Sequence, residues 1–231
     1  MTGLHGLFIT GTDTGVGKTY IGAAVIPQMA ARGVRVVPRK PVESGCELAD
    51  GKLVPADAIK LHTAASRLGD LGEICPYRLR HALSPERAAQ LEGLHLTIAD
   101  LQEACINNIG GDAFLWVEGA GGFYSPLASD GLNADLAARL GLPVLLVAAD
   151  RLGCINHVLL TVEAIRAHGL DLLAVVLNKT TPDIAPMMDN AADLSERLEC
   201  PLFSIGHFES DKSVRSQIAR LSQLLNWRAA R

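Results

Sequence analysis

The sequence predicts an α/β fold of three layers, in which helices cover both faces of a mostly parallel central sheet. Two observations lead to this prediction. Short apolar runs alternate along the chain with longer segments of helical periodicity, and continuous apolar strands are typical of a sheet buried on both faces. The chain also has 231 residues, 48% of them hydrophobic, which suits one large core, so residues 1–231 are predicted to form a single domain.

The elements follow from these runs in chain order. Strands are expected over residues 7–10, 34–37, 113–117, 143–148, 172–177 and 202–205, and helices over 18–32, 57–68, 98–108, 133–140, 155–168, around 194–198, and over 214–225. The first helix ends at Gly33, and Pro27 within it lacks a backbone donor and is predicted to kink it. Residues 69–96 are too rich in Gly, Pro and Arg for an assignment.

Composition excludes several classes of protein. With 21 Lys and Arg against 25 Asp and Glu, the net charge is −4, and neither nucleic acid nor a membrane surface is expected as a partner. The apolar stretch over 142–149 contains Pro143 and is far shorter than a bilayer-spanning helix. No signal peptide is recognised at the start, and the five cysteines lack metal-site spacing, so a cytoplasmic protein is predicted.

The strongest motif is a glycine-rich loop, GTDTGVGKT at residues 11–19, here called the phosphate loop. It follows a predicted strand and opens a predicted helix, so its amides and the positive helix end favour phosphate binding. Lys18 would reach the terminal phosphates and the Thr19 hydroxyl would coordinate Mg²⁺. The usual spacing would place a glycine at position 12, where this chain has Thr12 and carries the glycine one residue earlier. A P-loop NTPase fold is therefore predicted.

Charged residues stand at two further strand ends. Lys40 follows the second strand and is fixed by Pro41, although a lysine there also fits a solvated surface position. Glu118 follows the third strand, where an unpaired charge would be costly and a metal-linked acid is favoured. Asp57 opens a helix and fits either a ligand or a simple N-cap. Because ligands gather at the carboxyl ends of parallel strands, these side chains are expected near the phosphate loop.

Taken together, these segments resemble the dethiobiotin synthetase family, ATP-dependent enzymes of biotin synthesis. The resemblance is carried by TGTDTGVGKT at 10–19, KPVESG at 40–45, ADA at 56–58, VEGAGG at 117–122, LGCINH at 152–157, and Asn178 ahead of Thr181-Pro182. The segments follow the family's order and extend over essentially the whole chain.

The resemblance implies a homodimeric enzyme that makes dethiobiotin from 7,8-diaminononanoate, CO₂ and ATP, with Mg²⁺. The diamine takes up CO₂ as a carbamate, and the γ-phosphoryl group of ATP then passes to a carbamate oxygen, giving a carbamic-phosphoric anhydride. The second amine closes the ureido ring and expels phosphate.

The resemblance also implies a role for each matching residue. Lys40 and Lys18 would be catalytic, and Thr19, Asp57 and Glu118 would hold the metal. The nucleotide would be bound by Gly15, Val16, Gly17, Lys18, Thr19, Tyr20, Asp57, Glu118, Gly119, Ala120, Gly121, Asn178 and Gly206, with Asn178 at the base. The diamine and its carboxylate would be bound by Thr14, Ser44, Gly153, Cys154, Ile155 and Asn156, the last four across the dimer interface. Core packing, and no catalytic role, is favoured for the side chains of Cys154 and His157.

Three positions depart from the family pattern. Gly15 replaces an acidic residue of some relatives, so any role of that carboxylate is absent here. Glu43 stands where a neutral residue is common, and its charge either weakens the effect of Lys40 or points outward. Gly206 leads into His207-Phe208-Glu209 in place of a proline-containing segment near the base. Adenine is the expected base, with another nucleoside triphosphate as the alternative.

Two other functions fit the sequence less well. A regulatory or partitioning ATPase of this fold would carry a second lysine in the phosphate loop, where this chain has Asp13. Such a switch also has no need of Lys40-Pro41. A cobyrinate-type amide synthetase would need a glutaminase domain, for which the chain has no room.

Overall fold

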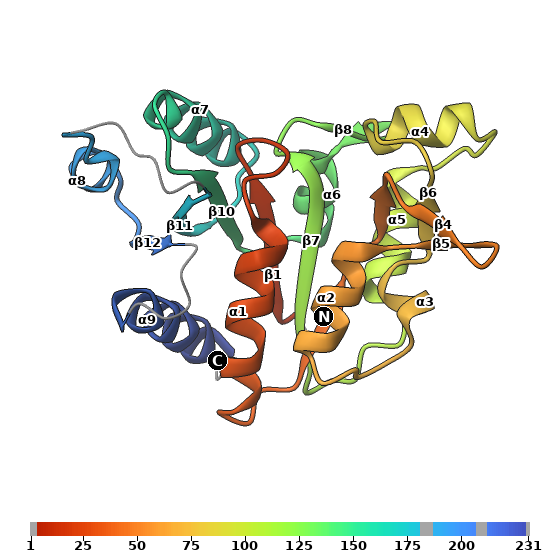
Figure 1. Cartoon of the computed structure of the whole chain (residues 1–231), viewed down its shortest axis with the longest axis horizontal. Helices are drawn as coiled ribbons and strands as arrows, with labels where there is room; N and C mark the ends of the chain where they lie inside the picture. Colours follow the sequence, from red (N-terminus) through yellow and green to blue (C-terminus); the bar gives the residue numbers. More distant parts are fainter. Residues whose placement is uncertain (1–3, 181–186, 207–211, 230–231) are drawn as a thin grey trace.

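Figure 1 shows a computed structural model that describes residues 4–180, 187–206 and 212–229. Its centre is a six-stranded sheet in the order β12-β11-β10-β1-β7-β2, in which every neighbouring pair is parallel. The strands are β1 (Gly6–Gly11), β2 (Val36–Arg39), β7 (Phe114–Gly122), β10 (Val144–Ala149), β11 (Leu172–Lys179) and β12 (Leu202–Gly206). The predicted fold class is confirmed.

Helices cover both faces of this sheet. Those of the described residues are α1 (Lys18–Ala30), α2 (Ala56–Ala64), α3 (Leu71–Ile74), α4 (Pro85–Leu91), α5 (Ile98–Ile106), α6 (Asn133–Leu140), α7 (Cys154–Ala167), α8 (Asn190–Ser195) and α9 (Lys212–Ala229). Helices α1, α2 and α9 pack on one face, and α5, α6 and α7 on the other. The sheet is therefore the middle one of three layers.

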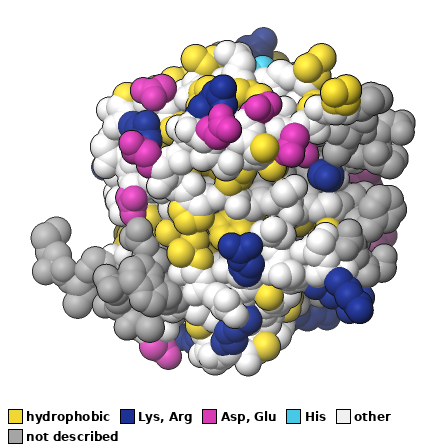
Figure 2. Space-filling view, turned by 90° about the vertical axis from the view of Figure 1, so that its left-hand side faces the viewer, with side chains coloured by type: hydrophobic (Ala, Val, Ile, Leu, Met, Phe, Trp, Pro, Cys, Tyr) yellow, Lys and Arg dark blue, Asp and Glu magenta, His cyan; other side chains and the backbone are white. Residues whose placement is uncertain are grey.

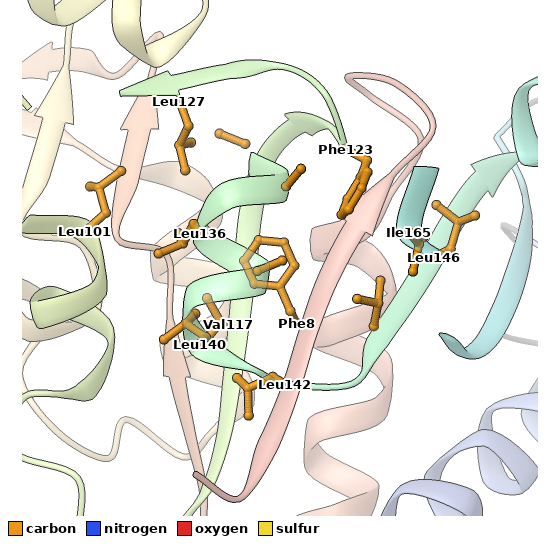
Figure 3. Close-up of a cluster of buried hydrophobic side chains, with 14 of the residues drawn as sticks. Phe8, Leu101, Val117, Phe123, Leu127, Leu136, Leu140, Leu142, Leu146 and Ile165 are labelled. Atoms are coloured by element: carbon orange, nitrogen blue, oxygen red, sulfur yellow. The ribbon is translucent and has the colours of Figure 1, made fainter. Parts of the chain in front are cut away.

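Successive side chains of β1 point to opposite faces of the sheet, so the core is divided into two clusters. Leu7 and Ile9 point toward α1 and α9, whereas Phe8 between them points to the opposite face. Figure 3 shows this second cluster, where Phe8 lies against Leu136 and Leu140 of α6. All of these side chains are fully or almost fully buried, so both faces of β1 contribute to the core.

The remaining short strands form three separate two-stranded sheets. Strand β3 (Val42–Ser44) pairs in parallel with β6 (Tyr77–Leu79). The other two pairs are antiparallel: β4 (Glu47–Ala49), which is exposed, pairs with β5 (Lys52–Val54), and β8 (Pro126–Ala128) pairs with β9 (Gly131–Leu132). These pairs, with α3 and α4, come from regions for which the sequence predicted little, because strands of two or three residues carry too short a pattern.

Most predicted elements are present, with shifted ends. The helix predicted over 57–68 stops at Ala64, because Ser66 and Arg67 adopt positive φ values of 58° and 57°. The second strand runs over Val36–Arg39 in place of 34–37. The third continues as far as Gly122, since its glycines allow it to keep pairing with β1 at Gly11. Helix α1 continues through Pro27 to Ala30, and the kink there stays a prediction.

The outer surface carries charges of both signs. On the face shown in Figure 2, most acidic side chains lie in the upper part and basic side chains lie in both halves, with apolar side chains between them. Among the described residues, no helix combines the length and the apolar character needed to cross a bilayer.

Candidate functional site

The phosphate loop joins the carboxyl end of β1 to helix α1, at the top of the sheet in Figure 1. Gly17 precedes the helix with a φ of 96°, a conformation that favours glycine. A Cβ atom there would also lie 2.0 Å from Nδ2 of Asn178. The loop is thus shaped by a glycine that no other residue replaces without strain.

Lys18 spans the space between this loop and the end of β7. Its Nζ donates to the carbonyl oxygens of Gly121 at 2.6 Å and Asp13 at 3.3 Å. Burial, followed by the nearby positive charge of Lys40, lowers the pKa of Lys18 to about 8. The lysine is therefore still mostly protonated at neutral pH, and triphosphate oxygens would favour that form.

Glu118 forms the centre of the site. It lies on β7 and is 1% exposed, and its Oε1 accepts from the Thr19 hydroxyl and from Nζ of Lys40, both at 2.8 Å. Within the described part of the chain, its Oε2 is buried and lacks a hydrogen-bond partner. A buried carboxylate oxygen without a partner is costly unless a ligand completes it.

Lys40 is buried as well, which contradicts the solvated-surface alternative. It is 4% exposed, and its Nζ also donates to the Gly119 carbonyl at 3.1 Å. Burial acts to lower the pKa of Lys40, but the charges of Glu118 and Asp57 outweigh it and the pKa is raised. Lys40 therefore carries a permanent positive charge beside the phosphate loop.

Asp57, on helix α2, lies close to the Lys40 ammonium. Its Oδ2 lies 3.7 Å from Nζ of Lys40, and its Oδ1 lies 3.8 Å from Nζ of Lys60. The N-cap alternative is wrong, since Pro55 occupies that position and Asp57 lies within the first turn. The carboxylate is left to face the cavity.

The residues around Glu118 fit a magnesium ion. Mg²⁺ prefers a few hard oxygen ligands completed by phosphate and water. Thr19 and Glu118 are in contact, Asp57 lines the same cavity, and Oε2 of Glu118 is an unused carboxylate oxygen. Groups of three or more His, Cys, Asp or Glu side chains suited to a metal are absent from the described residues.

Two cavities adjoin at this edge of the sheet. One, of about 300 Å³, is lined by fourteen residues that include Lys18, Lys40 and Asp57, and the other, of about 410 Å³, extends toward α4. Thr14, Ser44, Ala120 and Gly121 line both. The predicted residues that line the first cavity are Thr14, Gly15, Gly17, Lys18, Thr19, Tyr20, Lys40, Ser44, Asp57, Glu118, Ala120 and Gly121.

Asn178 is predicted to lie at the nucleobase. The structure places it at the end of β11, 2% exposed, with its Nδ2 donating to the Val16 carbonyl at 2.9 Å. Its buried Oδ1 has no partner among the described residues. Asn178 therefore holds the phosphate loop, and base recognition by it stays a prediction.

Gly206 ends β12 close to α1. Its carbonyl accepts a hydrogen bond from the Tyr20 hydroxyl at 3.1 Å, which brings two predicted nucleotide-binding residues together. Thr181-Pro182 and His207-Phe208-Glu209 lie outside the described residues.

The residues predicted to bind the substrate carboxylate lie elsewhere. Gly153, Cys154, Ile155 and Asn156 form the start of α7, and none of them lines either cavity of this chain. The backbone N–H of Cys154 donates to the Arg151 carbonyl at 3.0 Å, and its side chain is buried in the core as predicted. His157 is partly buried. Arg151 also approaches Asp13 at 4.0 Å.

Sequence reasoning missed Asn133, which holds the segment after Glu118 in place. Its Oδ1 accepts from the Ala120 N–H at 3.0 Å, and its Nδ2 donates to the carbonyls of Ala120 at 2.5 Å and Gly122 at 3.0 Å. The side chain is fully buried. A buried asparagine at a helix start gives no sequence signal of its own, because its partners come from a loop eleven to thirteen residues earlier.

Known proteins provide an independent comparison. Residues 5–217 match a family model described as an AAA domain. An ATP-dependent dethiobiotin synthetase BioD of Anaeromyxobacter dehalogenans is 44% identical over 193 residues, which cover 83% of this chain and 85% of that relative. One of Ruthia magnifica is 37% identical over 209 residues, covering 90% and 94%. The chain belongs to the ATP-dependent dethiobiotin synthetase family.

A solved structure with a different function has a similar fold. The cell division ATPase MinD of Pyrococcus furiosus superposes with a TM-score of 0.52 at 17% identity, covering 97% of this chain and 99% of MinD. At that identity the likeness shows the fold alone. The sequence resemblance to dethiobiotin synthetase is confirmed, while the roles of individual site residues remain predictions.

If Asn178 anchors the phosphate loop, Asn178→Ala should weaken binding of any polyphosphate. We expect the affinities for ATP and for inorganic tripolyphosphate to fall together, by roughly five- to tenfold, the value of one buried hydrogen bond. Calorimetry measures both. Asn190→Ala, which removes another buried amide bonded to Asp150, is the matched control and should change neither. Loss of ATP affinity alone would contradict the anchoring role.

Proposed function

We propose that this chain catalyses the ATP-dependent closure of 7,8-diaminononanoate and CO₂ to dethiobiotin, in biotin synthesis. Family membership supports this function, and so does one observation in the structure. Two buried lysines, Lys18 and Lys40, flank the buried Glu118 at one cavity of the phosphate loop. That arrangement suits a reaction in which a phosphoryl group is transferred to an oxygen of a carbamate, because both groups are negatively charged.

Each step of the reaction uses these charges. One amine adds to CO₂ and loses a proton, which leaves a carbamate. A carbamate oxygen then attacks the γ-phosphorus, ADP departs, and the mixed anhydride forms. The second amine attacks the carbonyl carbon, phosphate leaves with the C–O bond electrons, and the attacking nitrogen releases one of its two protons.

Lys18 and Lys40 stabilise the charge that moves in these steps. Lys18 binds the γ-phosphate from the loop side, while Lys40, oriented by Glu118 and the Gly119 carbonyl, bridges the carbamate and the γ-phosphate. Such fixed positive groups are the main source of catalysis in phosphoryl transfer. Mg²⁺, held by Thr19, Asp57 and Glu118, would neutralise phosphate oxygens when bound.

The second cavity suits the diamine. It adjoins the phosphate-binding cavity at Thr14 and Ser44, and the Ser44 hydroxyl, which donates to the Leu83 carbonyl at 2.7 Å, can still accept from an amine. This is where Thr14 and Ser44 would hold the amine and carbamate end.

The same proposal includes a homodimer. Leu160 on α7 is 62% exposed and lines a cavity of about 550 Å³ with Phe123, Tyr124 and Pro126. Leu160 and Tyr124, which is 52% exposed, leave apolar surface open there, whereas Phe123 is buried. Adjoining exposed apolar surface marks protein interfaces. Pairing at α7 would carry Gly153–Asn156 of one subunit toward its partner, where their backbone could bind the substrate carboxylate. The free cysteines, all five of them, are typical of a cytoplasmic enzyme.

A partitioning switch is not favoured, because the position of its second phosphate-loop lysine is occupied by Asp13. The Asp13 carboxylate lies 4.0 Å from the Arg151 guanidinium.

The two functions give different results in one assay. Purified protein is incubated with ATP, Mg²⁺ and bicarbonate, with and without 7,8-diaminononanoate. We expect ADP only with the diamine, together with a product that has gained one carbonyl and lost two hydrogens. Hydrolysis that ignores the diamine would overturn the proposal.

Replacing Lys40 should separate chemistry from nucleotide binding. We expect Lys40→Gln to lower kcat by roughly 100-fold or more, the cost of removing one charge-stabilising donor, while the Kd for a non-hydrolysable ATP analogue changes little. Because this variant leaves Glu118 buried without its cation, Lys40→Arg is tested in parallel, with thermal melts of both. Full turnover by either folded variant would contradict a role for the Lys40 ammonium.

Leu160→Glu should dissociate the dimer, because a carboxylate would be buried in an apolar contact. Size-exclusion chromatography coupled to light scattering measures the molar mass. We expect twice the chain mass for the native protein and the mass of one chain for the variant. Leu68→Glu, a similar change at an exposed leucine between α2 and α3, should remain dimeric. A native monomer, or a dimeric Leu160→Glu, would refute pairing at α7.

A further inference from the structure

Helix α2 begins without a capping side chain of its own. Its N-cap residue is Pro55, which offers no acceptor to the first backbone N–H groups of the helix. The carboxylate of Glu43 takes this place from β3. Its Oε1 accepts from the Asp57 N–H at 2.9 Å, and its Oε2 accepts from the Ala58 N–H at 3.0 Å.

This cap is buried and comes from a distant point of the chain. Glu43 is 6% exposed, so the expectation that its charge points outward is wrong. Burial raises the pKa of Glu43, while its two backbone hydrogen bonds oppose the rise. Its charge also adds to the groups that keep Lys40 protonated, and whether it weakens the effect of that lysine on a ligand stays a prediction. A buried carboxylate on the positive end of a helix is well compensated.

The cap links two parts of the candidate active site. Glu43 stands three residues after Lys40, and the first residue it caps is Asp57, whose carboxylate faces Lys40 at 3.7 Å. Glu43, Lys40 and Asp57 all line the same cavity. Any movement of the start of α2 therefore changes where the Asp57 carboxylate lies relative to Lys40 and Glu118.

We propose that Glu43 is a positioning residue that sets Asp57 for metal-nucleotide binding by capping helix α2. The proposal rests on the proposed function for the identity of the reaction, but its contacts involve only the nucleotide side of the site. Loss of the cap lets the first turn of α2 move, and the Asp57 carboxylate loses its fixed place. Binding of Mg²⁺ with nucleotide is weakened, whereas binding of the diamine is not.

The test measures the Mg²⁺ dependence of binding of a non-hydrolysable ATP analogue, by calorimetry on the full chain. Glu43→Gln replaces one acceptor oxygen by an amide that repels the facing N–H, and roughly tenfold weaker Mg²⁺-dependent affinity is expected. The KM for the diamine should change less than twofold. Asp130→Asn is the matched control, because Asp130 caps helix α5 from a distance through the Ile98 N–H at 2.7 Å; it should leave the Mg²⁺ dependence unchanged.

A double-mutant cycle shows whether Glu43 acts through Asp57. In an Asp57→Asn background the effect of Glu43→Gln should shrink to less than about twofold, since coupled residues are not additive. Full additivity would overturn the proposal. So would an unchanged Mg²⁺ dependence with only a lower melting temperature, or a raised diamine KM with unchanged nucleotide binding.

A rescue variant keeps the test decisive if Glu43→Gln folds poorly. Pro55→Ser places an ordinary N-cap acceptor at the start of α2, and the double variant Glu43→Gln with Pro55→Ser should recover most of the lost affinity. No recovery in a folded double variant would show that Glu43 does not act as a cap. The nucleotide-binding readouts, unlike the diamine KM, do not depend on diamine turnover, so absence of turnover in the native protein would refute the proposed function separately.

Discussion

The contact between Glu118 and Lys40 is the interaction on which the rest of the site depends. Both side chains are almost completely buried and lie 2.8 Å apart, so each would be costly without the other. The pair joins β7 to the segment after β2, and the Thr19 hydroxyl on the same carboxylate oxygen adds the phosphate loop. Three segments that are distant in sequence are therefore fixed by one carboxylate.

Around this contact, buried polar side chains hold the segments that line the site. Asn133 binds the glycine-rich end of β7, Asn178 binds the phosphate loop, and Glu43 binds the start of α2. In each case a buried side chain satisfies backbone groups that lie outside regular hydrogen bonding. This gives the glycines room for close approach while limiting their movement, which a site for phosphoryl transfer needs.

The fold and the chemistry have different origins in the sequence. The α/β fold is shared with a protein as distant as the MinD ATPase, at 17% identity, and that likeness extends only to the fold. What distinguishes this chain is charge at strand ends, with Lys40 after β2 and Asp13 in the phosphate loop. Fold-level likeness alone would have left the ligase and the switch equally open.

The sequence by itself determined the sheet, the phosphate loop and the family. Apolar runs and a glycine-rich motif are local patterns, and they predicted all six central strands, although the third was predicted to end at residue 117 and continues to Gly122. It did not determine which partners the charged residues have. The sequence was compatible with Asp57 as an N-cap, with a solvated Lys40 and with an outward-pointing Glu43. In the structure Pro55 is the N-cap, and both Lys40 and Glu43 are buried. The reason is physical: burial and hydrogen bonding of a charge depend on residues that come from other elements, and these meet only when the chain is folded.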